Sequence, residues 1–166
     1  MTAAYAAARP AAEEVLYRPA TLLDVSAMAQ LRSEHWGNAP DWELRLASYM
    51  SGEHHPRHAR LPRIVIIAEQ GDEVIGFIAG HLTRRYKCDG ELQWINVSPD
   101  HRGQGVATGL LRELADWFAS NNARRICVDV QPRNATARAF YTRHGAEPLN
   151  DHWLVWPDIV GAVPAS

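Results

Sequence analysis

Apolar residues follow two different periods along the chain, one typical of strands and one of amphipathic helices. Short apolar runs, which indicate strands, are found at residues 15–18, 64–68, 74–79, 91–97, 126–130 and 152–156. Stretches with apolar residues three or four positions apart, which indicate helices, are found at residues 21–36, 40–51, 104–121 and 134–144. This order of elements predicts an α/β fold, a single mixed domain.

Local signals mark where several of these elements begin and end. Thr21 and Asp24 have the spacing of a capping box, in which two side chains bond free N–H groups at a helix start. Gly52 stands where a glycine commonly ends a helix. The polar sequence over residues 53–62 predicts a loop, and residues 70–73 have the composition of a hairpin turn.

Composition and charge restrict the class of protein. The 166 residues are 46% hydrophobic and 22% charged, which is typical of a globular domain. A net charge of −2 argues against nucleic-acid and membrane-surface partners. No apolar run approaches the roughly 20 residues of a transmembrane helix, and two cysteines are too few for a disulfide framework. We therefore expect a soluble, cytoplasmic domain over residues 15–157, with a disordered leader (1–14) and a short C-terminal tail (158–166).

The segment from Val97 to Ala107 carries the clearest chemical signal. It places the end of an apolar strand, a turn with Gly103 and Gly105, and the start of a helix in immediate succession. Such a turn directs backbone N–H groups and a helix dipole at one point, which suits a pyrophosphate, and Arg102 adds positive charge. The segment lacks the lysine of a Walker P-loop, and its glycines are one residue too widely spaced for a Rossmann fingerprint. A tight turn without a ligand is the alternative interpretation.

Two motifs resemble signatures of the GNAT superfamily of N-acetyltransferases. Arg102-x-x-Gly105-x-Ala107 is similar to the family's coenzyme A signature, (Q/R)-x-x-G-x-(G/A). Residues 134–146, which include Tyr141, are similar to the family segment N-x-x-A-x-x-(L/F)-Y-x-(K/R)-x-G-(F/A). The resemblance extends over roughly residues 15–156. It implies a mostly antiparallel sheet flanked by helices, acetyl-CoA as cosubstrate, no metal, and direct transfer of the acetyl group to an amine acceptor in a ternary complex.

The strand over residues 91–97 shows an irregular alternation. Its apolar positions are Leu92 and Trp94 and then Ile95 and Val97, so the alternation slips between Trp94 and Ile95. An extra residue in one strand, a β-bulge, gives such a slip, while a strand buried on both faces is the alternative. The resemblance implies a bulged central strand here, because the family uses one to separate this strand from its parallel neighbour and make room for the thioester.

Acetyl transfer needs a neutral amine, donors for the developing oxyanion and a proton for the departing thiolate. Tyr141 matches the tyrosine that protonates the thiolate in the family, with core packing as its alternative role. Glu91 is the candidate base, and His81 or water alone remains open. The resemblance implies a cofactor-binding set made of Ile95, Asn96, Val97, Arg102, Gly103, Gln104, Gly105, Val106, Ala107, Asn134 and Tyr141. Asn134 also fits a helix cap that needs no ligand.

The sequence does not identify the acceptor. Asp41, Glu43, Trp36 and Trp42 fall in the segment that covers the acceptor pocket in the family, where acidic and aromatic groups would suit a cationic amine. A helix start with two packing tryptophans is the alternative. We expect a small-molecule amine, with a peptide or protein amine, or a non-catalytic acyl-CoA-binding module, as alternatives. The oligomeric state also stays open, and a homodimer is one option.

Overall fold

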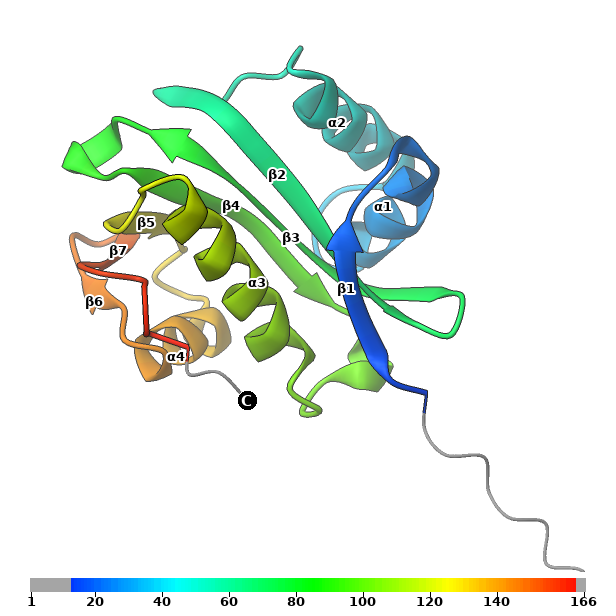
Figure 1. The fold of residues 1–166 in the computed structure, drawn as a ribbon. Helices are drawn as coiled ribbons and strands as arrows, with labels where there is room; N and C mark the ends of the chain where they lie inside the picture. The colour runs from blue at the N-terminus through cyan, green and yellow to red at the C-terminus, as the bar shows by residue number, and fades with distance from the viewer. Residues whose placement is uncertain (1–12, 164–166) are drawn as a thin grey trace, which may run out of the picture.

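A computed structural model describes residues 13–163 and shows one seven-stranded sheet with helices on both faces (Figure 1). The elements are β1 (Val15–Pro19), α1 (Val25–Ser33), α2 (Ala39–Ser51), β2 (Ala59–Gln70), β3 (Glu73–Thr83), β4 (Gly90–Val97), α3 (Val106–Ser120), β5 (Ile126–Asp129), α4 (Ala135–Arg143), β6 (Glu147–Pro148) and β7 (Trp153–Trp156). The strand order is β1-β2-β3-β4-β5-β7-β6, and only β4 and β5 pair in parallel. The predicted mixed, mostly antiparallel α/β fold is confirmed.

The predicted helix boundaries hold where hydrogen bonds satisfy the local signals. The capping box of Thr21 and Asp24 forms at a 3₁₀ turn that leads into α1. Asn38 caps α2 by accepting from the Asp41 N–H group, and Gly52 ends the same helix in the left-handed conformation. These contacts join residues close in sequence, which is why the pattern of the chain was sufficient to locate the capping box and Gly52. The cap by Asn38 was not predicted.

Two predictions about strands are wrong because strand pairing depends on distant residues. The predicted loop over residues 53–62 contains the start of β2, where Ala59 pairs with Thr83. The two-residue strand β6, which pairs with β7, was not predicted at all. A segment of two residues has no period, and the polar start of β2 has no apolar alternation, so neither pattern distinguishes these strands from loops.

The sheet separates two hydrophobic cores. The core under α1 and α2 includes Met28, Leu46 and Phe77, whereas the core under α3 and α4 includes Leu110 and Phe118 (Figure 1). The second core also contains Ile159 and Val163, both buried. Residues 158–163, expected as a tail outside the domain, therefore pack against it. The expected leader lies outside the described residues up to position 12, and the last three tail residues do so as well. None of the helices in residues 13–163 has the length and apolar character needed to cross a bilayer.

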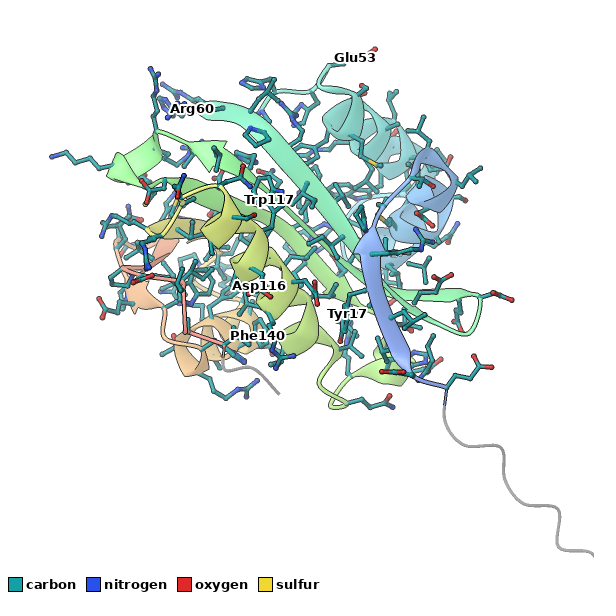
Figure 2. All side chains as sticks on the ribbon, viewed as in Figure 1. Tyr17, Glu53, Arg60, Asp116, Trp117 and Phe140 are labelled. Atoms are coloured by element: carbon teal, nitrogen blue, oxygen red, sulfur yellow. The ribbon has the colours of Figure 1, made fainter. Side chains whose placement is uncertain are left out.

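Gly109 of α3 lies against Tyr17 of β1, which Figure 2 labels beside this helix. A β-carbon added at Gly109 would overlap the Tyr17 hydroxyl and ring. Helix propensity alone favours Gly109→Ala by about 1 kcal/mol. We expect the opposite, a loss of about 1–2 kcal/mol in the free energy of unfolding, because the half-buried tyrosine has to move. Urea denaturation of the variant measures this loss.

A second comparison introduces Gly109→Ala into a variant that lacks the Tyr17 side chain. In a Tyr17→Ala background the obstacle is absent, so Gly109→Ala should be neutral or stabilising, and the two substitutions should be strongly non-additive. A Gly109→Ala variant that is more stable than the wild-type chain would contradict the inferred close approach.

Candidate active site

Strands β4 and β5 separate in the middle of the sheet. Their parallel pairing consists of three residue pairs and ends where Leu92 faces Val128. β4 continues to Val97 with β3 as its strand partner. Within the described part of the chain, residues 93–97 of β4 therefore have no strand beside them on the β5 side. We call this stretch the open edge of β4. Its backbone N–H and C=O groups on that side are available to an extended ligand.

The predicted bulge is confirmed at the start of the open edge, although its position differs from the prediction. Ala79 of β3 faces Trp94 and Gly80 faces Leu92, so Gln93 is the extra residue. Leu92 consequently lies in the core under α3, whereas Trp94 lies in the core under α1 and α2. The prediction placed the slip in the alternation between Trp94 and Ile95, one step later in the chain than Gln93. It did so because an apolar tryptophan fits either face of a buried strand.

The turn between β4 and α3 has the geometry predicted for an anion-binding turn. A 3₁₀ turn over residues 99–101 follows β4, and α3 begins after Gly105, whose φ of 82° is left-handed. Residues 102–105 are exposed, and no side chain caps the helix. The first N–H groups of α3 are therefore left without a side-chain acceptor. Such groups, together with the helix dipole, bind phosphates.

All six residues predicted in this turn lie together, but their side chains differ in what they can contribute. The exposed Arg102 guanidinium lies 3.0 Å from His35 Nε2 through its Nη2 atom. Gln104 Nε2 donates to the Asp100 carbonyl at 3.4 Å. Val106 is buried in the core under α3, so only its backbone is available to a ligand, and Ala107 is half-buried beside it. Arg102 is therefore the side chain of this turn that brings positive charge.

Tyr141 of α4 is buried among aromatic rings. Its ring centroid lies 5.6 Å from those of both Phe140 and Trp156, in edge-on contacts. Burial raises the pKa of its phenol well above the usual value, and the positive charge of Arg32 acts in the opposite direction. The phenol therefore keeps its proton at neutral pH. The structure gives Tyr141 the packing role considered as an alternative, and it also leaves a protonated hydroxyl that can act as an acid.

The two base candidates, Glu91 and His81, lie in one buried network. Glu91 Oε2 is 2.6 Å from His81 Nε2, and Glu91 Oε1 is 3.6 Å from Arg85 Nε. His81 Nδ1 lies 2.9 Å from the hydroxyl of Tyr49, whose pKa is raised by burial. A protonated Tyr49 donates to Nδ1, so Nε2 carries the hydrogen that faces the carboxylate. Nδ1 forms the hydrogen bond with Tyr49, whereas Nε2 lies close to the carboxylate without the geometry of a hydrogen bond, and the ring is 0% exposed. His81 thus lies directly against Glu91, and which of the two acts as the base remains a prediction.

Asn134 lies at the start of α4, whereas the predicted oxyanion donors lie on β4. Asn134 caps α4, with its Oδ1 accepting from the Ala137 N–H group at 3.1 Å. The cap interpretation is confirmed, and a contact with the cofactor remains a prediction. Ile95, Asn96 and Val97 all lie on the open edge of β4. Ile95 and Val97 pack against the core under α3, and the Asn96 side chain contacts α1 on the opposite face.

Sequence reasoning missed two arginines, Arg32 of α1 and Arg45 of α2. Arg32 Nη1 donates to Asn96 Oδ1 at 2.9 Å. The guanidinium carbon of Arg45 lies 4.8 Å from the ring centroid of Trp42. Arginines therefore contact two of the four residues first considered for a cationic acceptor, Trp36 and Trp42. The other two are Asp41 and Glu43. Trp36 and Trp42 were the available signal, since tryptophan rings commonly receive arginines.

Two shallow surface hollows lie beside the loop between β6 and β7. They share Asn150, Asp151 and His152, and one of them also includes Tyr86 and Trp153. Neither includes a residue of the β4–α3 turn, whose residues 102–105 are exposed. Over residues 13–163, no three His, Cys, Asp or Glu side chains are grouped so that they could hold a metal ion.

Comparisons with known proteins agree with this geometry. The model of the Acetyltransferase (GNAT) family matches residues 26–146. The chain is 35% identical over 63 residues to the uncharacterized N-acetyltransferase YobR of Bacillus subtilis, covering 38% of this chain and 26% of that protein. It is 31% identical over 106 residues to the L-2,4-diaminobutyric acid acetyltransferase of Nocardia farcinica, covering 58% of this chain and 54% of that protein. The chain thus spans less than two thirds of the length of these curated relatives.

A solved structure has the same fold. The GNAT family N-acetyltransferase YhbS from Escherichia coli, crystallised in complex with CoA, superposes with a TM-score of 0.67 at 18% sequence identity. The superposition covers 94% of this chain and 87% of that chain. At this level of identity the likeness concerns the fold alone.

Proposed function

Because the chain belongs to the GNAT acetyltransferase family, we propose that it transfers the acetyl group of acetyl-CoA to a primary amine of a small molecule. The observation that carries the proposal is the continuity between the open edge of β4 and the uncapped start of α3. The open edge of β4 offers free strand N–H groups, and the turn before α3 offers an exposed place for an anion. A ligand with a pyrophosphate, an extended amide-containing arm and a terminal thioester fits that order of features.

The cofactor contacts follow from this placement. The backbone N–H groups at the start of α3, over residues 105–107, bind the pyrophosphate, and Arg102 adds a charge-assisted contact. The open edge of β4 pairs with the amides of pantetheine as a neighbouring strand would. Backbone N–H groups at Ile95–Val97 are then close to the thioester carbonyl and stabilise the negative charge that develops on its oxygen.

The reaction itself needs three proton transfers. Glu91 accepts a proton from the ammonium group through a water molecule, which leaves a neutral amine to attack the carbonyl carbon. A tetrahedral intermediate forms, its nitrogen loses a second proton to water, and its collapse breaks the carbon–sulfur bond. Tyr141 donates its proton to the departing thiolate, in keeping with the raised pKa of its phenol. The buried contact of Glu91 with His81 supports an enzyme over a non-catalytic acyl-CoA-binding module, since binding alone needs no such carboxylate.

A small-molecule acceptor is supported by one of the relatives. The Nocardia farcinica protein is named for L-2,4-diaminobutyric acid, a small primary amine. A thiol-release assay with acetyl-CoA and a broad panel of amines, including peptides with free N-termini, tests this part of the proposal. Release of thiol with small amines is expected, and release with peptides alone would overturn the small-molecule assignment.

The cofactor site can be tested with Gly105→Val. Acetyl-CoA at 100 times its Kd should stabilise the wild-type chain by about 2.7 kcal/mol, which raises Tm by roughly 5–10 °C at this chain length. The valine is strained at a φ of 82° and moves the backbone N–H groups away from the pyrophosphate. We expect the Kd of acetyl-CoA, measured by calorimetry, to rise about 10- to 50-fold, a loss of roughly 1.4–2.3 kcal/mol.

Gly161→Val is the matched control for this experiment. Gly161 also has a φ of 82°, and a β-carbon at either glycine meets no atom within 4 Å. Both variants carry the same backbone strain, but only Gly105 lies at the start of α3. An equal Kd for acetyl-CoA in the two variants would remove the turn from the cofactor site. The absence of any shift in Tm for the wild-type chain would overturn the proposed function.

A further inference from the structure

Two arginines and three tryptophans form a cluster beside the open edge of β4. The guanidinium carbon of Arg32 lies 5.2 Å and 5.0 Å from the ring centroids of Trp36 and Trp42. That of Arg45 lies 4.8 Å from Trp42 and 5.5 Å from Trp94. The cluster lies on the sheet face that also holds Glu91, because Trp94 and Asn96 follow the bulge on the α1 and α2 side. We call these five residues the arginine–tryptophan cluster.

The cluster carries two positive charges, and no carboxylate of residues 13–163 forms an ion pair with either of them. Arg18, Arg85 and Arg124 are examples of arginines that form ion pairs with carboxylates among the described residues. Neither Arg32 nor Arg45 forms one. Burial, and to a smaller extent Arg45, lowers the pKa of Arg32 to about 10, so the group is still cationic at neutral pH. A half-buried cation without an anion beside it is unfavourable, and the site therefore favours an anionic ligand.

One edge of the Arg32 guanidinium is already used, and another is free. Nη1 donates to Asn96 Oδ1, whereas the buried Nε atom has no hydrogen-bond partner. Nε and Nη2 form the side-on edge of a guanidinium, which matches the two oxygens of a carboxylate. Arg45 is exposed and lies over the same tryptophan, so its guanidinium can approach the same anion from solvent.

The position of the cluster connects this anion site with the reaction. Asn96, which bonds Arg32, lies on the open edge of β4 that receives the thioester in the proposed function. The positive charge of Arg32 also acts on the Tyr141 phenol, whose pKa it lowers against the larger effect of burial. A molecule bound to the free edge of Arg32 would hold the rest of its atoms beside the thioester.

We infer that the acceptor is an amino acid, a primary amine that also carries a carboxylate, and that Arg32, assisted by Arg45, binds this carboxylate. The inference rests on the proposed function and specifies the substrate class of the same site. The bound carboxylate replaces the missing counter-ion, and the amine is then directed toward Glu91. Trp42 and Trp94 are buried and shield one side of the ion pair from water, which strengthens it.

The test compares L-amino acids with the amines obtained by removing their carboxylate. Suitable pairs are L-2,4-diaminobutyrate with 1,3-diaminopropane, and L-lysine with cadaverine. For at least one pair we expect kcat/KM of the wild-type enzyme to be about 10- to 100-fold higher for the amino acid, the size of one charge-assisted contact. In Arg32→Met the ratio within that pair should fall to about 1, and Arg45→Gln should reduce it partly. Equal kcat/KM values throughout the wild-type panel would overturn the inference.

Controls separate this inference from folding and from the proposed function. Arg124→Gln removes a surface arginine that pairs with Asp158, and it should keep the wild-type ratio. The Kd of acetyl-CoA in Arg32→Met reports whether the variant is folded, and the exposed Arg45 provides a second variant if it is not. If no amine releases thiol, the proposed function fails. Calorimetry of the CoA-bound protein then still tests the carboxylate site: the site is supported if amino acids bind and Arg32→Met loses that binding. It is overturned if amino acids do not bind or bind both proteins equally.

Discussion

Replacing Tyr141 with phenylalanine should lower kcat for acetyl transfer by about 100- to 1,000-fold, within the range observed for loss of a general acid. The substitution keeps the ring that packs against Phe140 and Trp156 and removes only the hydroxyl. The Kd of acetyl-CoA should therefore change by less than about twofold, and the free energy of unfolding by about 1 kcal/mol or less. Steady-state kinetics with saturating acetyl-CoA, calorimetry and urea denaturation measure these three quantities.

The pH dependence follows from the raised pKa of the phenol. Because burial favours the neutral form, Tyr141 keeps its proton well above neutral pH, and kcat of the wild-type enzyme should show no alkaline decline between pH 7 and about 10, the ordinary pKa of a tyrosine. Tyr17→Phe is the matched control, since it removes a tyrosine hydroxyl outside the site and should leave kcat unchanged. If Tyr141→Phe retained the wild-type kcat, the residue would have only the packing role.

Features of the site that lie close together in sequence were predictable. The strand, the glycine turn and the start of α3 follow one another within residues 97–107, and the cap of α4 lies within Asn134–Ala137. Each depends on hydrogen bonds or backbone angles that neighbouring residues determine. The alternation alone left a bulge and a doubly buried strand open, and the family resemblance favoured the bulge. Its position was not predicted, because the apolar side chain of Trp94 fits both cores.

Contacts between elements distant in sequence could not be predicted from the pattern. Arg32 and Asn96 are 64 residues apart, and neither the helical period of α1 nor the alternation of β4 indicates that they meet. The pair of Glu91 and His81 depends on the register of β3 and β4, which the bulge at Gln93 shifts by one residue. A slip of one residue reverses the face of every later side chain. The chemistry of the acceptor side was therefore accessible only after the register was known.

Replacing Glu91 with glutamine should lower kcat/KM for the amine at pH 7 by about 100- to 1,000-fold, because the amide cannot accept the proton of the ammonium group. Glutamine has the same shape, and its amide oxygen can take the place of the carboxylate oxygen beside His81, so the fold should be retained. The distinguishing measurement is the pH profile. Above the pKa of the amine most of the acceptor is already neutral and needs no base, so the variant's defect should shrink steadily as the pH rises.

Two further variants identify which group acts as the base. His81→Asn removes the ring that lies against the carboxylate but leaves the carboxylate itself, so its defect in kcat/KM should be smaller than that of Glu91→Gln. The reverse order would assign the base to His81, and a wild-type rate in both variants would assign it to water. Glu69→Gln is the control, since it removes a half-buried, ion-paired glutamate of β2 that lies outside the site. A defect that stayed constant up to high pH would show that Glu91 acts on the geometry of the site rather than on the proton.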